Sequence, residues 1–169
     1  MDLNRKRNRK DRRYNVRGFT LMELIITLAL LAIVALIAVP SFQRIAINSN
    51  LKTAVRDIAS DFALYKERAI AENLMYRISL NVAGNSYQLQ QCNNPGSPCG
   101  GWTPIQNKNL SAYANDIIFD SVNTTQTNYT FQTRGTVNMG TVALGNSRNS
   151  TATITTNITG RTNVQFNLQ

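Results

Sequence analysis

A continuous apolar run, from Phe19 to Val39, constrains the fold of this chain more than any other feature. It holds 21 residues, of which thirteen are Phe, Leu, Ile or Val and four are Ala, and Glu23 is its only charge. A helix of this length crosses a bilayer. At about 0.3–0.6 kcal/mol each, the thirteen apolar residues favour insertion by about 4–8 kcal/mol, whereas Glu23 costs at most about 3 kcal/mol. The run therefore predicts a transmembrane helix over residues 19–39, and the role of its carboxylate remains to be explained.

Basic residues precede this run directly. Residues 1–18 hold eight Lys or Arg against Asp2 and Asp11, a net charge of +6, whereas the other 151 residues contribute +3. A basic run of this kind serves as a nucleic-acid arm, a membrane-surface patch or a topology signal. Because it adjoins the apolar run, the positive-inside rule explains it best and predicts that the C-terminal part is exported. A secretory signal peptide would have a shorter apolar core with its cleavage site behind it.

The residues at the start of the run, Gly18-Phe19-Thr20-Leu21-Met22-Glu23, resemble the type III signal of type IV pilins and type II secretion pseudopilins. In that signal a basic leader and a glycine precede Phe-Thr-Leu-x-Glu and an apolar helix. The resemblance implies that a prepilin peptidase removes residues 1–18 by cutting between Gly18 and Phe19, and that Phe19 is then N-methylated. It also implies that Glu23 pairs with the terminal amine of a neighbouring subunit.

The position of Glu23 agrees with this role on physical grounds. A carboxylate in the first turn of a helix lies at the positive end of the helix dipole. In the low dielectric of a helix bundle it needs a cationic partner, which the amine of a cleaved Phe19 would supply. An ordinary membrane anchor that tolerates an interfacial glutamate is the alternative interpretation.

Pro40 ends the apolar run without ending the predicted helix. It removes a backbone hydrogen bond and clashes with the carbonyl four residues earlier, so we expect a helix kink at Leu36–Pro40. Beyond it, an amphipathic helix is predicted over residues 40–73, because apolar residues recur there at spacings of three and four. This apolar stripe, which we expect to pack on a soluble head, consists of Leu51, Val55, Ile58, Phe62, Tyr65 and Ala69.

From Met75 the period of the apolar pattern changes to two, which is typical of β-strands. Residues 76–82 and 87–89 are expected to form a hairpin around the turn at 83–86. Further strands are expected at 117–119, 129–133, 141–144, 151–155 and 163–168. The predicted fold class is α+β, a long N-terminal helix packed on a β-rich, sandwich-like head over residues 74–169.

Cys92 and Cys99 enclose a loop rich in turn residues. In an oxidising compartment the two would pair, and closing so short a ring would contribute about 2.5 kcal/mol to stability. Two cysteines in a chain without histidine cannot complete a zinc site, and neither a metal nor another cofactor is expected. We expect Trp102, just after the loop, to cover the core.

Residues 129–161 resemble in pattern the C-terminal domain of the GspH/FimT group, which comprises a minor pseudopilin of type II secretion and minor pilins of type IV pili. The resemblance is carried by Tyr129-Thr-Phe131-x-x-Arg134-Gly135, Thr141-Val-Ala-Leu144, Ala152-Thr-Ile154 and Gly160-Arg161. DNA-binding members of the group carry Gly-Arg-x-Arg, whereas Asn163 replaces the second arginine here. The candidate DNA contacts are Arg161, Arg134 and Arg148. A hairpin turn with a solvated arginine also explains Gly160-Arg161.

Three functions are consistent with these observations. The leading one is a minor pilin or pseudopilin, anchored in the bacterial inner membrane with its head in the periplasm, which joins other subunits in a type IV pilus or type II secretion pseudopilus, at its tip. The alternative is a DNA-binding minor pilin for DNA uptake. Residues 76–169 have a net charge of +3, and phosphate binding would weaken steeply with salt. A periplasmic enzyme is disfavoured, because the head offers no plausible general base for a nucleophile.

Overall fold

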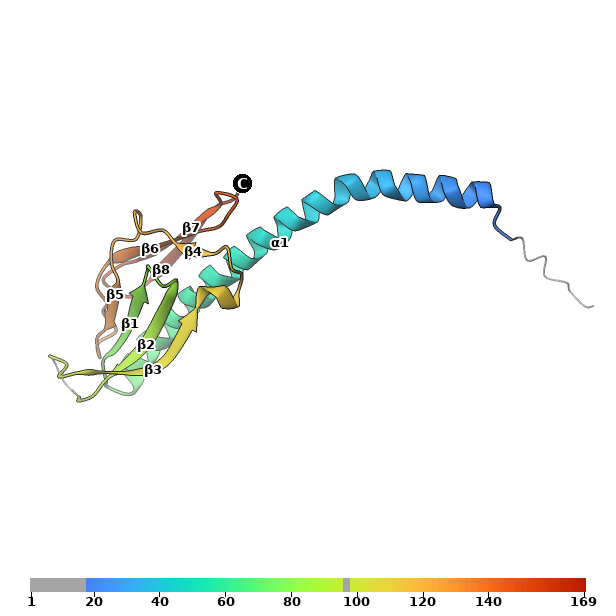
Figure 1. Ribbon diagram of the computed structural model, residues 1–169. Coiled ribbons are helices and arrows are strands. Elements are labelled where there is room, and N and C mark those ends of the chain that lie inside the picture. Colours follow the sequence, from blue (N-terminus) through green and yellow to red (C-terminus); the bar gives the residue numbers. More distant parts are fainter. Residues whose placement is uncertain (1–17, 96–97) are drawn as a thin grey trace, which may run out of the picture. The chain divides into compact units, whose positions relative to one another are not determined.

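The computed structural model describes residues 18–95 and 98–169 of the 169-residue chain. The chain divides into two compact units, residues 1–40 and 41–169. The described residues form one long helix, eight strands and a short 3-10 turn (Figure 1). The eight basic residues of the expected leader lie before Gly18, outside the described residues.

Helix α1 (Leu21–Ala71) begins and ends within two residues of the bounds predicted from the apolar pattern. Pro40 lies inside the helix, so the prediction that the helix continues past this proline is confirmed. The kink expected at Pro40 stays a prediction. At the other end Asn73 adopts a left-handed φ of 50°, and the Leu74 N–H donates to the Ala69 carbonyl at 3.3 Å. Asparagine tolerates this conformation better than most residues, so it ends the helix locally.

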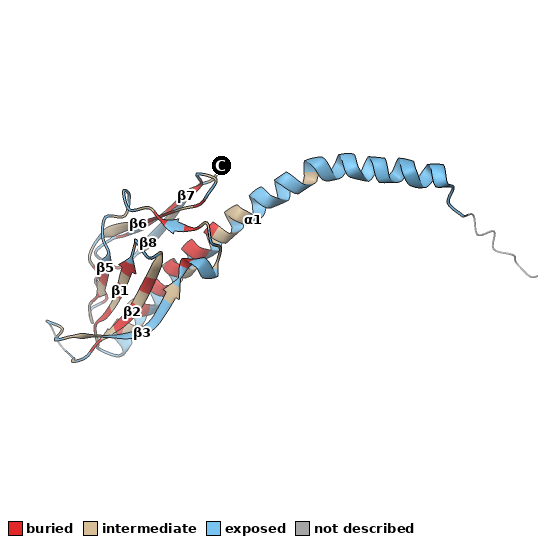
Figure 2. Ribbon diagram, viewed as in Figure 1, coloured by how far each residue is buried: buried red, intermediate tan, exposed pale blue. Residues whose placement is uncertain are grey.

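The second half of α1 carries the core of the head. All six residues of the predicted apolar stripe are buried, and Figure 2 shows the buried residues along this part of the helix. The stripe meets aromatic side chains of the first sheet. The Phe62 ring lies edge-on to Tyr129 and Phe131, with centroids 4.9 Å and 5.6 Å away. Such edge-to-face contacts add to the burial of apolar area, and they fix the helix against the sheet.

The first sheet contains β1 (Tyr76–Asn81), β2 (Ser86–Cys92), β3 (Trp102–Asn109) and β5 (Asn128–Phe131) in the antiparallel order β3-β2-β1-β5. The predicted hairpin of β1 and β2 is confirmed. Strand β3 was not predicted, since most of its side chains are exposed on both faces and no alternation of apolar residues marks it. Pairing with β2, rather than burial of a hydrophobic face, makes it a strand.

The second sheet contains β4 (Ile118–Phe119), β6 (Gly140–Gly145), β7 (Thr151–Thr156) and β8 (Thr162–Asn167) in the antiparallel order β4-β6-β7-β8. These bounds lie within two residues of the predicted ones. A bridge between Phe131 and Val137 and a hydrogen bond from Val137 N–H to the Ile158 carbonyl (3.1 Å) link the two sheets. The predicted α+β architecture is confirmed.

Candidate functional site

The peptide bond between Gly18 and Phe19 is accessible in the structure. Both residues precede α1 and are exposed, Phe19 by 77%. A Cβ atom added at Gly18 would have no other atom within 4 Å. The fold of the chain therefore does not require glycine at this position, and any such requirement would come from an enzyme that binds the segment.

The next residues cap and charge the start of α1. The hydroxyl oxygen of Thr20 accepts a hydrogen bond from the Glu23 N–H (3.2 Å), and its carbonyl accepts one from the Leu24 N–H (3.1 Å), as in a threonine N-cap. The Glu23 carboxylate is exposed and makes no ion pair with any described residue. It lies at the positive end of the helix dipole, where it is available to a cation from outside the chain.

The apolar residues of α1 before Pro40 are exposed, except Ala38, which is partly exposed (Figure 2). The large ones are 49% to 77% exposed. This part of α1 is long and apolar enough to cross a membrane. Removing apolar surface from water contributes about 25 cal/mol per Å², so lipid or other helices must cover this surface in the cell.

In the head, Lys108 of β3 binds two carboxylates of α1. Its Nζ donates to Asp57 Oδ2 (3.2 Å) and to Asp61 Oδ1 and Oδ2 (3.0 and 2.8 Å). The Tyr87 hydroxyl donates to Asp61 (2.7 Å) and the Tyr113 hydroxyl donates to Asp57. Asp61 is buried, whereas Asp57 and Lys108 are partly buried. This group of five side chains, the Lys108 network, ties the edge strand β3 to the helix.

The Lys108 network shifts the pKa values of its members. Burial opposes the charge of Asp57, but hydrogen bonds from Tyr113 and Lys108 outweigh it and lower the pKa of Asp57. Burial likewise opposes the charge of Lys108, yet Asp61 and Asp57 raise the pKa of Lys108. Burial and the bond to Asp57 raise the pKa of Tyr113 to about 12. At neutral pH Lys108 is therefore a cation that faces the carboxylate of Asp57.

The Lys108 network was not anticipated from the sequence, although one signal for it was present. Asp57 and Asp61 lie one helical turn apart, where like charges repel each other. Two carboxylates at this spacing, beside an apolar stripe, indicate a shared cation. The sequence does not say which one, because Lys108 follows Asp61 by 47 residues.

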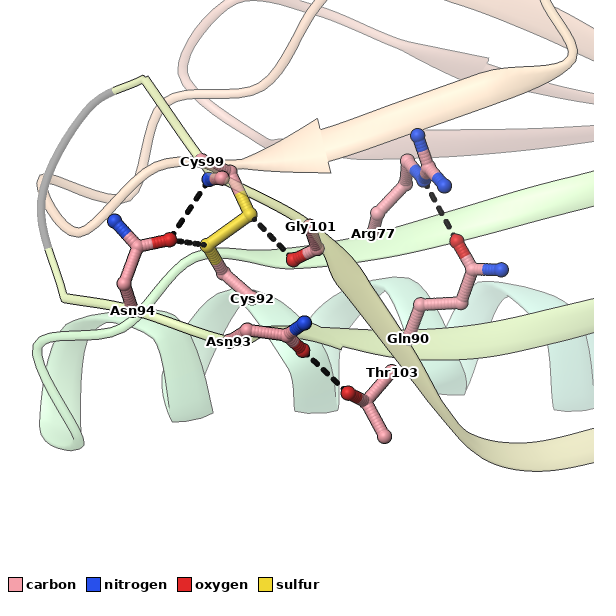
Figure 3. Close-up of a disulfide and its surroundings, with 9 residues drawn as sticks. Arg77, Gln90, Cys92, Asn93, Asn94, Cys99, Gly101 and Thr103 are labelled. Carbon is pink, nitrogen blue, oxygen red and sulfur yellow. Dashed lines mark hydrogen bonds between the residues drawn. A yellow bond between two sulfur atoms is a disulfide. The ribbon is translucent and has the colours of Figure 1, made fainter.

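Cys92 and Cys99 are joined by a disulfide, with their Cα atoms 5.8 Å apart (Figure 3). The Asn94 side chain supports the loop, because its Oδ1 accepts a hydrogen bond from the Gly100 N–H (2.7 Å). Backbone pairing continues between Asn93 N–H and the Gly101 carbonyl (3.0 Å). The bridge thus holds the start of β3 beside the end of β2.

Trp102 does not cover the core, contrary to the prediction. It begins β3 and is partly exposed. The Arg77 guanidinium lies 4.4 Å from its ring centroid, and Arg77 Nε donates to Gln90 Oε1 (2.7 Å). A cation over an indole face is a favourable contact. Because Arg77 alternates with buried residues of β1, Trp102 covers the outer face of the first sheet.

The structure brings together the two turns that carry Arg134 and Arg161. Each arginine adjoins a buried glycine of left-handed φ, Gly135 at 81° and Gly160 at 70°. A Cβ atom at Gly160 would lie 2.8 Å from Lys66 Cδ and 3.0 Å from the Gly135 carbonyl oxygen. The two turns therefore pack against each other and against the stem of Lys66, and only glycine fits at Gly160. We call Lys66, Arg134 and Arg161 the basic cluster.

Arg148 does not join the basic cluster. It lies in the turn between β6 and β7, whereas Arg161 follows the opposite end of β7. The six residues of that strand separate the two arginines by about 20 Å. The three arginines named from the sequence therefore do not form one surface.

Two sequence families match the chain in different parts. Residues 13–39 match the prokaryotic N-terminal methylation motif, and residues 54–160 match the type II transport protein GspH. A comparison with curated protein sequences gives no match.

Solved structures share the fold at low sequence identity. The minor pseudopilin EpsH from the type 2 secretion system of Vibrio cholerae is 13% identical, with a TM-score of 0.56 over 69% of this chain and 97% of EpsH. The type IV minor pilin FimU of Pseudomonas aeruginosa is 12% identical, with a TM-score of 0.53 over 70% of this chain and 90% of FimU. Likeness at these identities establishes the fold alone.

The GspH match spans more than half of the chain, from the buried part of α1 through every described strand except β8. The methylation motif includes the accessible bond after Gly18 and the exposed Glu23. The chain therefore belongs to the GspH family of type II transport proteins.

Proposed function

We propose that this protein is a minor structural subunit at the tip of a type IV pilus or a type II secretion pseudopilus. A prepilin peptidase removes residues 1–18 at the bacterial inner membrane, and the new terminal amine of Phe19 is methylated. Residues 19–39 cross the membrane once, and the head lies in the periplasm. The mature subunit then enters the filament through its N-terminal helix, alongside other pilin or pseudopilin subunits.

The observation that carries this proposal is the combination found at the start of α1. An accessible Gly18–Phe19 bond stands just before the Glu23 carboxylate, which forms no ion pair with a described residue, and the helix behind it exposes its apolar side chains. Packing between neighbouring helices would bury that surface, and the terminal amine of a neighbour would neutralise Glu23. An ordinary anchor accounts for the apolar surface but not for the other two features. That EpsH and FimU are minor subunits supports a minor role here.

Replacing Gly18 by valine should leave the leader attached. The chain itself has room for a side chain at this position, so the helix and the head should form as before, and the block should arise at the peptidase. Mass spectrometry of the membrane fraction should show the full precursor for Gly18→Val and a chain beginning at methylated Phe19 for the wild type. An unchanged mature mass would count against cleavage at this bond.

Removing the protein from its host should reduce the number of surface pili sharply if it primes a type IV pilus. Complementation with the wild-type chain should restore them, because a minor subunit acts at the start of assembly. Electron microscopy of the cells measures the count. Normal pili together with a secretion defect would assign the protein to the pseudopilus instead, and a strain with neither defect would contradict the proposal.

DNA binding is the second candidate function, and the basic cluster is the observation that favours it. Arg134 and Arg161 are exposed, and neither arginine forms an ion pair with a described residue. Cations close together on one surface can contact successive phosphates. In this interpretation the arginines of the head bind the phosphates of the DNA backbone.

A gel shift with duplex DNA tests this candidate. If the cluster binds phosphate, the double variant Arg134→Gln/Arg161→Gln should weaken DNA binding at least tenfold. The slope of log affinity against log salt concentration should also become shallower, by the amount that about two phosphate contacts contribute. Arg148→Gln is the matched control, since it removes a cation of the same kind at the far end of β7. Absence of a salt-sensitive shift with the wild type would eliminate DNA binding.

A further inference from the structure

Among the described strands of the head, three of the four sheet edges are protected against further pairing. At the β5 edge, the Asn138 side chain takes the place of a strand. Its Oδ1 accepts from the Thr130 N–H (2.8 Å) and its Nδ2 donates to the Asn128 carbonyl (2.7 Å). The Thr130 N–H and the Asn128 carbonyl therefore already have hydrogen-bond partners, so this edge of β5 offers little to a partner strand.

The edges at β4 and β3 are protected by other means. Strand β4 is short, and the chain that follows it continues to cover the edge of β6. There the Thr125 N–H donates a hydrogen bond to the Thr141 carbonyl (3.0 Å). Strand β3 carries Pro104 and Lys108 and pairs with β2 through a register shift. A proline, a lysine and an irregular register are common devices against edge-to-edge association.

Strand β8 has none of these protections. It contains no proline and no charged residue, and its register with β7 is regular. The Asn157 N–H donates to the Arg161 carbonyl at the turn. Along an antiparallel ladder, hydrogen-bonded pairs alternate with non-hydrogen-bonded pairs. Counted from this bonded pair, Asn163 and Gln165 bond to β7, while the N–H and carbonyl groups of Val164 and Phe166 face the outer edge. No hydrogen bond found in the described part of the chain reaches that edge.

The side chains at this edge are apolar and only partly covered. Val164, Phe166 and Leu168 pack against the core of the head, and each remains partly exposed. An added strand would place alternate side chains next to them. The occupant of the edge should therefore carry apolar residues at every second position.

Cations flank both ends of β8. Arg44 and Lys52 line a groove of about 290 Å³ together with Leu168, and the stem of Lys66 packs against Gly160, next to Arg161. Among the described residues these four cations form no ion pair. Antiparallel pairing with β8 of a second copy would bring like charges together at each end. The charge pattern instead favours a strand with a carboxylate near each of its ends.

We propose that the outer edge of β8 binds, by strand addition, an extended segment of another filament subunit with alternating apolar residues and a carboxylate near each end. Main-chain hydrogen bonds supply affinity in this mode, and the side chains supply specificity. The proposal rests on the proposed function, because it takes the partner to be a filament subunit. Its test does not use filament assembly, so the two proposals can fail separately.

The test measures amide hydrogen exchange by NMR on the full chain in detergent micelles. The probe is a blocked eight-residue peptide that alternates valine and threonine and has glutamate at both ends; the control peptide has lysine at both ends. The glutamate peptide should slow exchange of the Val164 and Phe166 amides at least tenfold. The amides of Asn163 and Gln165, which already bond to β7, should change less than twofold.

Two variants separate the backbone edge from the side chain. Val164→Pro removes an outward N–H without breaking a bond to β7 and should weaken peptide binding at least tenfold. Val164→Ala keeps the N–H and should weaken binding less than threefold. If Val164→Pro does not fold, the exchange measurement on the wild type decides alone.

Several outcomes would overturn the proposal. They are no protection of Val164 and Phe166 at millimolar peptide, equal protection by the lysine peptide, or equal binding by a folded Val164→Pro. Protection of the same amides by duplex DNA, without protection by the peptide, would make the edge part of a nucleic-acid site. Each of these results leaves incorporation into the filament, and its dependence on Glu23, as a separate question.

Discussion

Replacing Glu23 by valine should leave the protein inserted in the membrane but lower its incorporation into filaments at least tenfold. Removing the carboxylate removes a cost of up to about 3 kcal/mol from insertion, so the precursor should reach the membrane at least as well. In the filament, the terminal amine of a neighbour would lose its partner in a low-dielectric contact. Leaving one charge of such a pair unpaired costs about 3–5 kcal/mol, which is about a hundredfold or more in affinity.

The measurement compares the subunit in sheared filaments with the subunit left in the membrane, by immunoblot. Glu67→Val is the matched control, because Glu67 is an exposed acid in the later part of the same helix and forms no ion pair with a described residue. Glu23→Asp keeps the charge and should retain part of the incorporation. Wild-type amounts of Glu23→Val in the filament would refute the pairing of Glu23 with a terminal amine.

Replacing Lys108 by methionine should destabilise the head by about 2–4 kcal/mol, less than the 3–5 kcal/mol expected when a fully buried pair loses one partner. The buried Asp61 would keep only the Tyr87 hydroxyl as a donor, and its charge would lose its cation. The expected loss is smaller than for a fully buried pair because the Asp57 side chain is 39% exposed. Water screens the charge of Asp57, so losing its cation costs less. Urea unfolding of the full chain in micelles, followed by the fluorescence of Trp102, measures the free energy of unfolding.

Lys52→Met is the control, because Lys52 is a partly buried lysine of α1 without an ion pair to any described residue. Adding Asp61→Asn to Lys108→Met should restore part of the stability, because no buried charge then remains unpaired. A free energy of unfolding for Lys108→Met within about 0.5 kcal/mol of the wild type, the range of ordinary surface changes, would contradict a structural role for the network.

The same unfolding measurement should depend on pH in a defined direction. The pKa of Asp57 is lower in the folded chain than its ordinary value. Its contribution is therefore complete above an unfolded pKa of about 3.9 and is lost as the pH falls through the folded value. The pKa of Lys108 is raised, so its contribution is complete below an unfolded pKa of about 10.4 and is lost only as the pH rises through the folded value. Lys108→Met should show a weaker dependence at both ends.

The strands show where prediction from the sequence succeeded and where it did not. The hairpin of β1 and β2 was predictable because its strands bury one face, which leaves an alternating pattern in the sequence. Strand β3 leaves no such pattern, since its backbone pairs with β2 while its side chains stay exposed. Trp102 was assigned to the core for the same reason, because its stacking on Arg77 depends on a strand that the pattern does not reveal.

The sequence alone determined the apolar span, the methylation motif around Gly18 and Phe19, the buried stripe of α1 and most of the strands. Each of these follows from local properties: the length of an apolar run, its period, or a short motif. Only the tertiary structure decided which cation meets Asp57 and Asp61, that the turns of Arg134 and Arg161 pack together away from Arg148, and that β8 has the unprotected edge. These depend on pairings between residues far apart in the chain, which the folding of the whole head brings together and which no local pattern encodes.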